Sequence, residues 1–192
     1  MGRRFSLLWA LWPISAAASA AQAPPQVVQE RWTDTRPQPR GAALLRQAML
    51  AAHNSARAAA GMPPLVWSDA LARDATAYAA TLARERRFAH SPMPRGTPSQ
   101  GENLWMGTKT AYAYDEMTSG WIGERRLFKP GRFPNVSRNG DWGAIGHYTQ
   151  IIWRTTSAVG CGTAANATDE YLVCRYLPSG NVVGRNPMTG MP

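Results

Sequence analysis

Apolar residues recur at helical spacing in three stretches of the chain. The first stretch starts after Gly41 and is stopped by Gly61 and the two prolines that follow it closely. A second helix is expected after Ser68, which is a good N-cap residue, and it should end before Pro92. A third helix is expected over residues 110–128. Its inward stripe would comprise Tyr114, Met117, Trp121, Glu124 and Phe128.

Strand-like segments lie in the middle and at the end of the chain. Residues 101–106 (GENLWM) indicate a short buried strand, and residues 158–164 and 170–176 predict a hairpin around a turn-like Asn-Ala-Thr-Asp. We expect residues 147–153 to form one or two helical turns and residues 180–184 to add an edge strand. Helices interleaved with strands predict an α+β domain, with helices packed on a small, mainly antiparallel sheet.

The hairpin would bring the two cysteines of the chain together. If Ala164 faces Tyr171, the same antiparallel register places Cys161 opposite Cys174. Directly opposed Cβ atoms lie about 4.5–5.5 Å apart, close to the disulfide range. Such a bridge would add about 3 kcal/mol of stability and would fit an oxidising compartment.

The first residues have the pattern of an export signal. Arg3 and Arg4 precede an apolar run, and Ala20 or Ala23 ends a small-residue cleavage site. The alternative is a retained membrane anchor, but the run is shorter than the ~20 residues that a span needs. We therefore expect the mature protein to be secreted or periplasmic.

The remaining boundaries follow from composition. Residues 21–40 are rich in Pro and Gln and are expected to be a flexible lead-in after the signal at 1–20. The folded domain is expected at 41–187, followed by a tail at 188–192. The Ala- and Arg-rich composition is typical of a bacterial protein.

The net charge of the chain is +9. A basic balance can attract anionic lipids, cell-wall polymers or nucleic acid. The arginines are scattered, however, with short clusters only at 84–87 and 125–126, and we interpret them as solvated helix faces. Nucleic-acid binding is therefore not expected.

Glu124 is anomalous because it falls in the apolar stripe of the third helix, between Trp121 and Phe128. An ionised carboxylate buried there would need a partner, since burying it alone costs several kcal/mol. The alternative is that the helix end splays and Glu124 joins Arg125 and Arg126 on a wet edge. The pattern alone leaves both interpretations open.

Glu102 presents a similar choice. Both faces of its extended segment carry apolar or aromatic neighbours, so it needs a partner unless it lies at a strand end in water. His90 and His147 each lie where a Gly/Pro-rich loop meets a regular element, a common location for sites. His53 lies inside the first helix, and we expect it to be a hydrogen-bonded structural residue.

Several segments occur in the order, and with the residues, of a known family. They are HNSAR (53–57), AHS (89–91), GENLW (101–105), Trp121-x-x-Glu124, GHYTQIIWRTTSAVGCG (146–162) and YLVCRYLPSGNVVGRNP (171–187). This set closely resembles the motifs of the CAP superfamily, which includes cysteine-rich secretory proteins, venom allergens and plant pathogenesis-related proteins of group one. The resemblance covers about residues 44–187.

The resemblance implies a three-layer α-β-α sandwich with the sheet between helical layers. It also implies that His90, Glu102, Glu124 and His147 converge in one cleft as the tetrad of the family. A bridge between the last two strands agrees with the cysteine pairing inferred above.

Two positions depart from the family pattern. Phe88 stands in a region where members often carry a cysteine, and Phe128 stands where a tyrosine is usual. Neither departure affects the four tetrad residues.

Two imidazoles in one cleft suit Zn²⁺ or another divalent cation. His90 and His147 would be the metal ligands, while Glu102 and Glu124 would accept a ring N–H and fix each tautomer. With only two protein ligands, we expect weak binding that is lost as the histidines protonate below a pKa of ~6.5.

We expect a monomeric, non-catalytic binding module for an apolar ligand, resembling a sterol or fatty acid, or for an envelope or membrane surface. The alternative function is a metal-dependent hydrolase, peptidase- or esterase-like, using the same tetrad. The sequence contains no G-x-S-x-G or H-E-x-x-H motif. Aromatic residues that either line the cleft or fill the core are Trp105, Trp121, Trp142, Tyr148 and Trp153.

Overall fold

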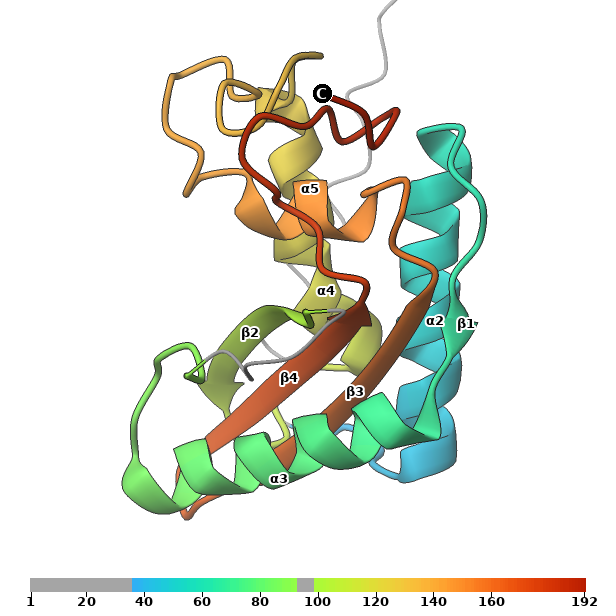
Figure 1. Cartoon of the computed structure of the whole chain (residues 1–192). Helices are drawn as coiled ribbons and strands as arrows, with labels where there is room; N and C mark the ends of the chain where they lie inside the picture. Colours follow the sequence, from blue (N-terminus) through green and yellow to red (C-terminus); the bar gives the residue numbers. More distant parts are fainter. Residues whose placement is uncertain (1–35, 93–98) are drawn as a thin grey trace, which may run out of the picture. The chain divides into compact units, whose positions relative to one another are not determined.

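The computed structural model describes residues 36–92 and 99–192 (Figure 1). The expected signal and most of the expected lead-in lie outside the described residues. The last residues of that lead-in contact the domain. The Gln38 N–H donates to the Thr110 carbonyl at 2.8 Å, and Arg40 forms an ion pair with Glu170. None of the described helices is long and apolar enough to cross a membrane.

The helices follow the apolar patterns, with one change at the third. The helical elements are α2 (Ala42–Ala59), α3 (Asp69–Glu85), α4 (Tyr114–Gly123), the 3₁₀ helix η1 (Glu124–Leu127) and α5 (Gly146–Ile151). The Ser68 hydroxyl caps α3 by accepting the Leu71 N–H. The third helix was expected to run from 110 to 128. It is shorter, because Thr110 has a left-handed φ of 59° before it and the chain tightens into η1 after Gly123.

The strands form one four-stranded sheet in the order β1-β3-β4-β2. They are β1 (Val66–Trp67), β2 (Gly101–Thr108), β3 (Ala158–Ala165) and β4 (Asp169–Leu177). The β3–β4 and β4–β2 pairs are antiparallel, and the two-residue β1 pairs in parallel with β3. The predominantly antiparallel sheet is confirmed, whereas the parallel β1 was not predicted.

The predicted hairpin register is confirmed. Ala164 faces Tyr171 and Cys161 faces Cys174, and the two cysteines form a disulfide with a Cα–Cα distance of 4.1 Å. The edge strand expected at 180–184 is wrong. That segment turns instead, with Asn181 in a left-handed conformation, and the Gly184 N–H donates to the Phe133 carbonyl rather than to the sheet.

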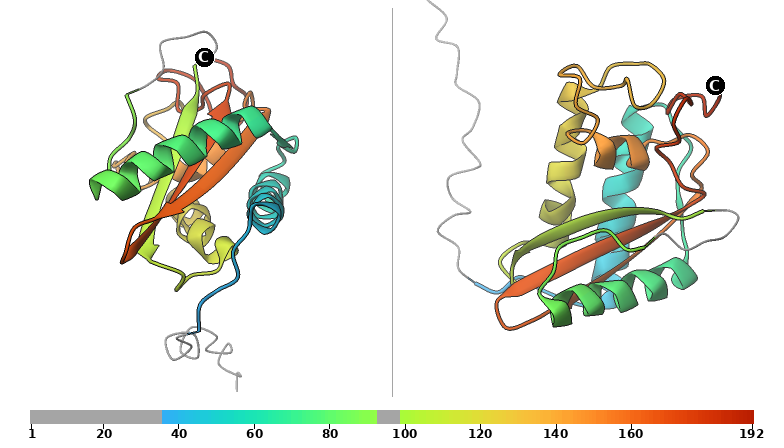
Figure 2. Two further views of the ribbon diagram at one scale, coloured as in Figure 1. Left: turned by 90° about the horizontal axis from the view of Figure 1, so that it is seen from below. Right: turned by 60° about the vertical axis from the view of Figure 1, so that its left-hand side comes forward.

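The sheet lies between two helical layers, as predicted (Figure 2). Helix α3 crosses one face, and α2, α4 and α5 cover the other. Strand β4 is buried on both sides: Leu172 and Tyr176 belong to the larger core under α2, α4 and α5, and Tyr171 and Val173 belong to the core under α3. Side chains of the central strand β4 therefore point alternately into the two cores.

A buried arginine fixes the position of α5. Arg57, at the end of α2, is fully buried, and its guanidinium donates to carbonyls of the segments after α2 and at the end of α5. Two of these bonds go from Nη1 to Ile151 and Trp153, at 2.8 and 2.9 Å. Burial lowers the Arg57 pKa to about 10, so the group remains charged at neutral pH. The short α5, which carries His147, is thereby anchored at its C-terminal end.

His53 is a hydrogen-bonded core residue, as predicted. It is fully buried on α2, with Nδ1 2.7 Å from the Met49 carbonyl and Nε2 2.7 Å from the Tyr176 hydroxyl. Nδ1 must donate to the carbonyl, so neutral Nε2 accepts from the tyrosine. Burial lowers its pKa to about 4; the Met49 carbonyl opposes this shift and Arg57 adds to it.

This lowered pKa predicts an acid-sensitive core. Because the folded-state pKa of His53 lies below its unfolded value of 6.5, the unfolded chain binds the proton more readily between those values. His53 therefore leaves stability unchanged above about pH 6.5 and costs up to about 3 kcal/mol as pH falls toward 4. Urea unfolding across this range should show a smaller pH slope for His53→Gln than for wild type, and equal slopes would contradict the assignment.

Candidate functional site

The first half of the site lies where the loop after α3 meets β2. Nδ1 of His90 is 2.7 Å from Oε1 of Glu102, and the Ser91 N–H donates to the same oxygen at 3.0 Å. The Glu102 side chain is 2% exposed, while that of His90 is 62% exposed. A neutral ring that donates through Nδ1 carries its lone pair on Nε2, so His90 offers a nitrogen ligand to solvent.

Behind Glu102 lies a buried cation. Nη2 of Arg175 lies 3.0 Å from Oε2 of Glu102 as an ion pair, without hydrogen-bond geometry. Its guanidinium lies over the Tyr78 ring, with Cζ 5.4 Å from the ring centre. The Tyr78 hydroxyl in turn donates to the carbonyl of Ala89, the residue before His90. Helix α3 and strand β4 therefore both constrain the His90–Glu102 pair.

The environment of Glu102 favours its ionised form. Burial by itself raises the Glu102 pKa, but the His90 hydrogen bond, the Arg175 guanidinium and the Ser91 contacts together hold it below its usual range. Glu102 is consequently an anion at neutral pH, and it keeps the His90 ring in one orientation.

The second half of the site lies between η1 and α5. Nδ1 of His147 is 2.6 Å from Oε1 of Glu124, and the Tyr148 N–H donates to Oε2 at 2.9 Å. The His147 ring stacks on Trp121, with ring centres 5.7 Å apart and planes at 15°. The Asn103 side chain donates to the His147 carbonyl at 3.2 Å. His147, with a 32% exposed side chain, is held on three sides and also directs Nε2 away from its carboxylate.

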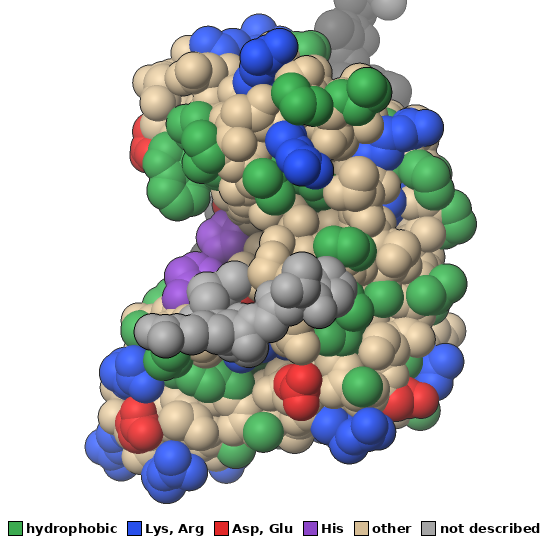
Figure 3. Space-filling view, viewed as in Figure 1, with side chains coloured by type: hydrophobic (Ala, Val, Ile, Leu, Met, Phe, Trp, Pro, Cys, Tyr) green, Lys and Arg blue, Asp and Glu red, His purple; other side chains and the backbone are tan. Residues whose placement is uncertain are grey.

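The edge strand β2 connects the two pairs. Glu102 binds His90, and the next residue, Asn103, binds the backbone of His147. Neighbouring residues of a strand point to opposite faces, so the two pairs flank the free edge of the sheet. In Figure 3, histidine side chains gather in a hollow on one side of the domain. Since His53 is fully buried, the histidines visible there are the exposed His90 and the partly exposed His147.

Both open questions about the acids are thus answered by the structure. Glu124 accepts from His147 and does not lie on a wet edge with Arg125 and Arg126, and Glu102 is buried against His90. The aromatic residues expected either in the cleft or in the core fall into two groups. Trp121, Tyr148 and Trp153 are core residues, whereas Trp105 is half-buried and Trp142 is 52% exposed.

Sequence reasoning missed Arg175 and Tyr78. The sequence did carry a signal for Arg175, because it is the one charge within the otherwise apolar segment YLVCRY, and a buried charge needs a partner. Its partner, Glu102, is 73 residues away and is brought opposite it only by the β2–β4 register. Tyr78 fits an ordinary apolar helix stripe and carried no signal.

Comparison with known proteins agrees with this geometry. The sequence model described as "Cysteine-rich secretory protein family" (CAP) matches residues 50–176. The chain belongs to the CAP family. Pathogenesis-related protein 1C of Nicotiana tabacum is 35% identical over 143 residues, covering 74% of this chain and 80% of the relative. The PR-1 type protein of Sambucus nigra is 33% identical over 137 residues, covering 71% and 77%.

Solved CAP structures share the fold. One described as "Crystal structure of NaASP2 with Zn2+" has a TM-score of 0.63 at 25% identity, covering 78% of this chain and 88% of that one. BmVAL-1 has a TM-score of 0.63 at 23% identity, covering 79% and 84%. Family membership, together with the disulfide, supports a secreted-type CAP domain.

The donor set at the hollow suits an open cation site. Among residues 36–92 and 99–192, no three or more His, Cys, Asp or Glu side chains form a group that could hold a metal ion. A cation here would have two imidazole nitrogens, from His90 and His147, and its remaining ligands would come from solvent or substrate. Two borderline-soft nitrogen donors fit Zn²⁺ in kind, but their number fits only a weak, exchangeable site.

Proposed function

We propose that this CAP domain is a secreted or periplasmic binding module that holds a divalent cation such as Zn²⁺ weakly through His90 and His147. The observation that carries the proposal is that each exposed imidazole donates Nδ1–H to a glutamate. Both rings are thereby fixed in the tautomer whose Nε2 can bind a metal. The bound cation would supply a Lewis-acidic centre in the hollow. The description of NaASP2 "with Zn2+" is consistent with such a site in a relative.

The same contacts argue against the hydrolase alternative. Glu102 uses Oε1 for His90 and Ser91 and pairs Oε2 with Arg175, and Glu124 uses both oxygens in hydrogen bonds. Each carboxylate of the tetrad is thus already engaged by its histidine and by a second group, which disfavours either acid as a general base for an attacking water. The Ser91 hydroxyl forms no hydrogen bond with His90, so the pair lacks the geometry of an activated nucleophile.

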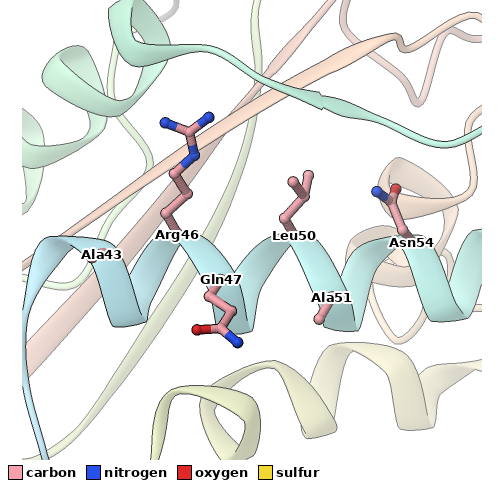
Figure 4. Close-up of a pocket in the computed structure, with 6 residues that line it drawn as sticks. All are labelled: Ala43, Arg46, Gln47, Leu50, Ala51 and Asn54. Atoms are coloured by element: carbon pink, nitrogen blue, oxygen red, sulfur yellow. The ribbon is translucent and has the colours of Figure 1, made fainter.

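An apolar ligand is the second part of the proposal. A second depression of about 520 Å³, open to solvent and separate from the histidine hollow, lies along α2, and none of the tetrad residues lines it (Figure 4). All six lining residues belong to α2, so an apolar ligand would lie on an open face of this helix. Lipid extraction and mass spectrometry of the purified protein test this part, and protein free of lipid after exposure to sterol and fatty acid would count against it. The lining residues are Ala43, Arg46, Gln47, Leu50, Ala51 and Asn54.

Calorimetric titration of zinc tests the cation site. We expect wild-type protein to bind zinc with a micromolar or weaker Kd at pH 7.5, and His147→Ala or His90→Ala to weaken it at least about tenfold. The affinity should be lower in acid than at pH 7.5, because protons compete with the metal for the imidazole nitrogens.

Glu85→Gln is the matched control for zinc held by surface carboxylates. Glu85 is an exposed acid near the end of α3, and its loss should leave the heats unchanged. Equal zinc heats for wild type, His90→Ala and His147→Ala would refute the proposed site.

A further inference from the structure

Exposed apolar side chains gather on loops at one end of the domain, the end occupied by the loop after η1 and the C-terminal segment in Figure 1. Val183 is 75% exposed and Trp142 is 52% exposed. Val182 and Met191 are exposed as well. We call these four residues the apolar tip. Exposed apolar side chains gathered at loop ends mark a candidate interaction surface.

Specific contacts hold the tip together. The buried Phe133 ring packs edge-on against Trp142, with centres 5.5 Å apart. Backbone bonds of 2.8 Å run from the Phe133 N–H to the Arg185 carbonyl and from the Gly184 N–H to the Phe133 carbonyl. The Asn186 N–H donates to the Met191 carbonyl, also at 2.8 Å. The exposed side chains are therefore presented by a tied framework rather than by independent loops.

Basic residues surround the tip without matching acids. Residues 124–154 and 181–192 contain seven exposed basic side chains and two acids, Glu124 and Asp141. Glu124 is already bound to His147. Within the described part of the chain, none of the seven pairs with an acid. They are Arg125, Arg126, Lys129, Arg132, Arg138, Arg154 and Arg185.

The end of α3 differs in part. Arg84 and the nearby Arg87 share an ion pair with Glu85, at 3.5 and 3.0 Å. Around the apolar tip, by contrast, none of the seven basic side chains has an acid partner within the described part of the chain. In Figure 3, basic and hydrophobic side chains lie side by side over the upper end of the domain.

We propose that the apolar tip docks on the surface of a bilayer rich in anionic phospholipid. Trp142 and Val183 enter the headgroup region, where tryptophan rings are favoured, and the surrounding arginines contact the phosphates. A soluble polyanion would engage the arginines but leave Trp142 and Val183 in water, so the combination favours a lipid surface. The inference goes beyond the proposed cation and ligand sites, and it requires no bound cation.

Vesicle sedimentation tests the inference on the whole protein. We expect binding to vesicles of phosphatidylcholine mixed with phosphatidylglycerol, and at least about tenfold weaker binding to phosphatidylcholine alone. High salt should weaken the binding. Val183→Asp and the double variant Arg132→Glu/Arg185→Glu should each reduce the partition coefficient at least about tenfold. Val183 is the better apolar probe, because Trp142 also packs on Phe133.

Two substitutions elsewhere serve as matched controls. Val66→Asp places the same charge at a 63% exposed valine on β1, and Arg84→Glu reverses an exposed arginine on α3. Both should bind vesicles as wild type does. Loss of binding upon charge reversal but not in Val183→Asp would overturn the proposal in favour of a purely ionic partner, and absence of vesicle binding would overturn it outright.

Zinc titration of the same proteins separates this inference from the cation site. Val183→Asp should keep the wild-type zinc heats, and His147→Ala should keep wild-type vesicle binding. Vesicle binding that requires His147 would contradict the independence of the two surfaces.

Discussion

Replacing Gly160 with alanine is expected to prevent α3 from packing on the sheet. A Cβ at Gly160 would lie 2.3 Å from the Ala72 nitrogen and 2.5 Å from the Ser68 carbonyl oxygen, both backbone atoms at the start of α3. Neither atom can rotate away, so the helix itself must move. Because α3 carries Tyr78, which binds the carbonyl before His90, the displacement would also disturb the site.

We expect Gly160→Ala to lose at least about 3 kcal/mol in the free energy of unfolding. Urea denaturation followed by circular dichroism measures this loss, and failure to recover folded protein would be its extreme form. Gly120→Ala, in α4, is the control. Nothing lies within 4 Å of its added Cβ, so the helix should gain up to about 1 kcal/mol. A Gly160→Ala protein as stable as wild type would contradict the close approach of α3.

Replacing Arg175 with methionine is expected to weaken both the fold and the cation site. The side chains of Arg175 and Glu102 are 5% and 2% exposed, so the variant leaves a buried carboxylate without its cation. Breaking a buried pair in this way costs about 3–5 kcal/mol. The Glu102 pKa should rise, and we expect zinc affinity to fall by about tenfold or more, because Glu102 orients His90.

Paired variants separate these effects. Arg175→Lys retains the charge and should restore part of the stability and of the zinc affinity. The double variant Arg175→Met/Glu102→Gln removes the unpaired charge and should be more stable than Arg175→Met, although its zinc affinity should stay low. Wild-type stability and wild-type zinc binding in Arg175→Met would show that Arg175 positions nothing.

The sequence predicted the local parts of the fold. The turn between β3 and β4 and the alternation of their residues were sufficient to place Cys161 opposite Cys174, because hairpin register is set over a few residues. Ser68 marked the start of α3 because an N-cap contact is also local: its hydroxyl accepts the N–H of Leu71, three residues later. The strand expected at 180–184 was wrong. Two neighbouring valines have a strand-like composition, but the adjacent Gly184 and Arg185 form backbone hydrogen bonds with the distant Phe133 instead of with the sheet.

The candidate site was predictable in its residues but not in its pairings. Glu124 was recognisable as a charge in an apolar stripe, yet its partner His147 lies 23 residues away across a Gly- and Pro-rich loop. Only the resemblance to CAP proteins grouped the four side chains. The pairing of Arg175 with Glu102 depends on two strands that meet only in the folded sheet, and no local pattern encodes it.

The most direct test of the account is a crystal structure of the protein grown with zinc, with anomalous data collected at the zinc absorption edge. The account predicts one anomalous peak in the hollow, bound to Nε2 of both His90 and His147, with each Nδ1 still on its glutamate. A peak at only one histidine, or zinc bound elsewhere with the hollow empty, would contradict the claim that the two carboxylate-held imidazoles form a single cation site.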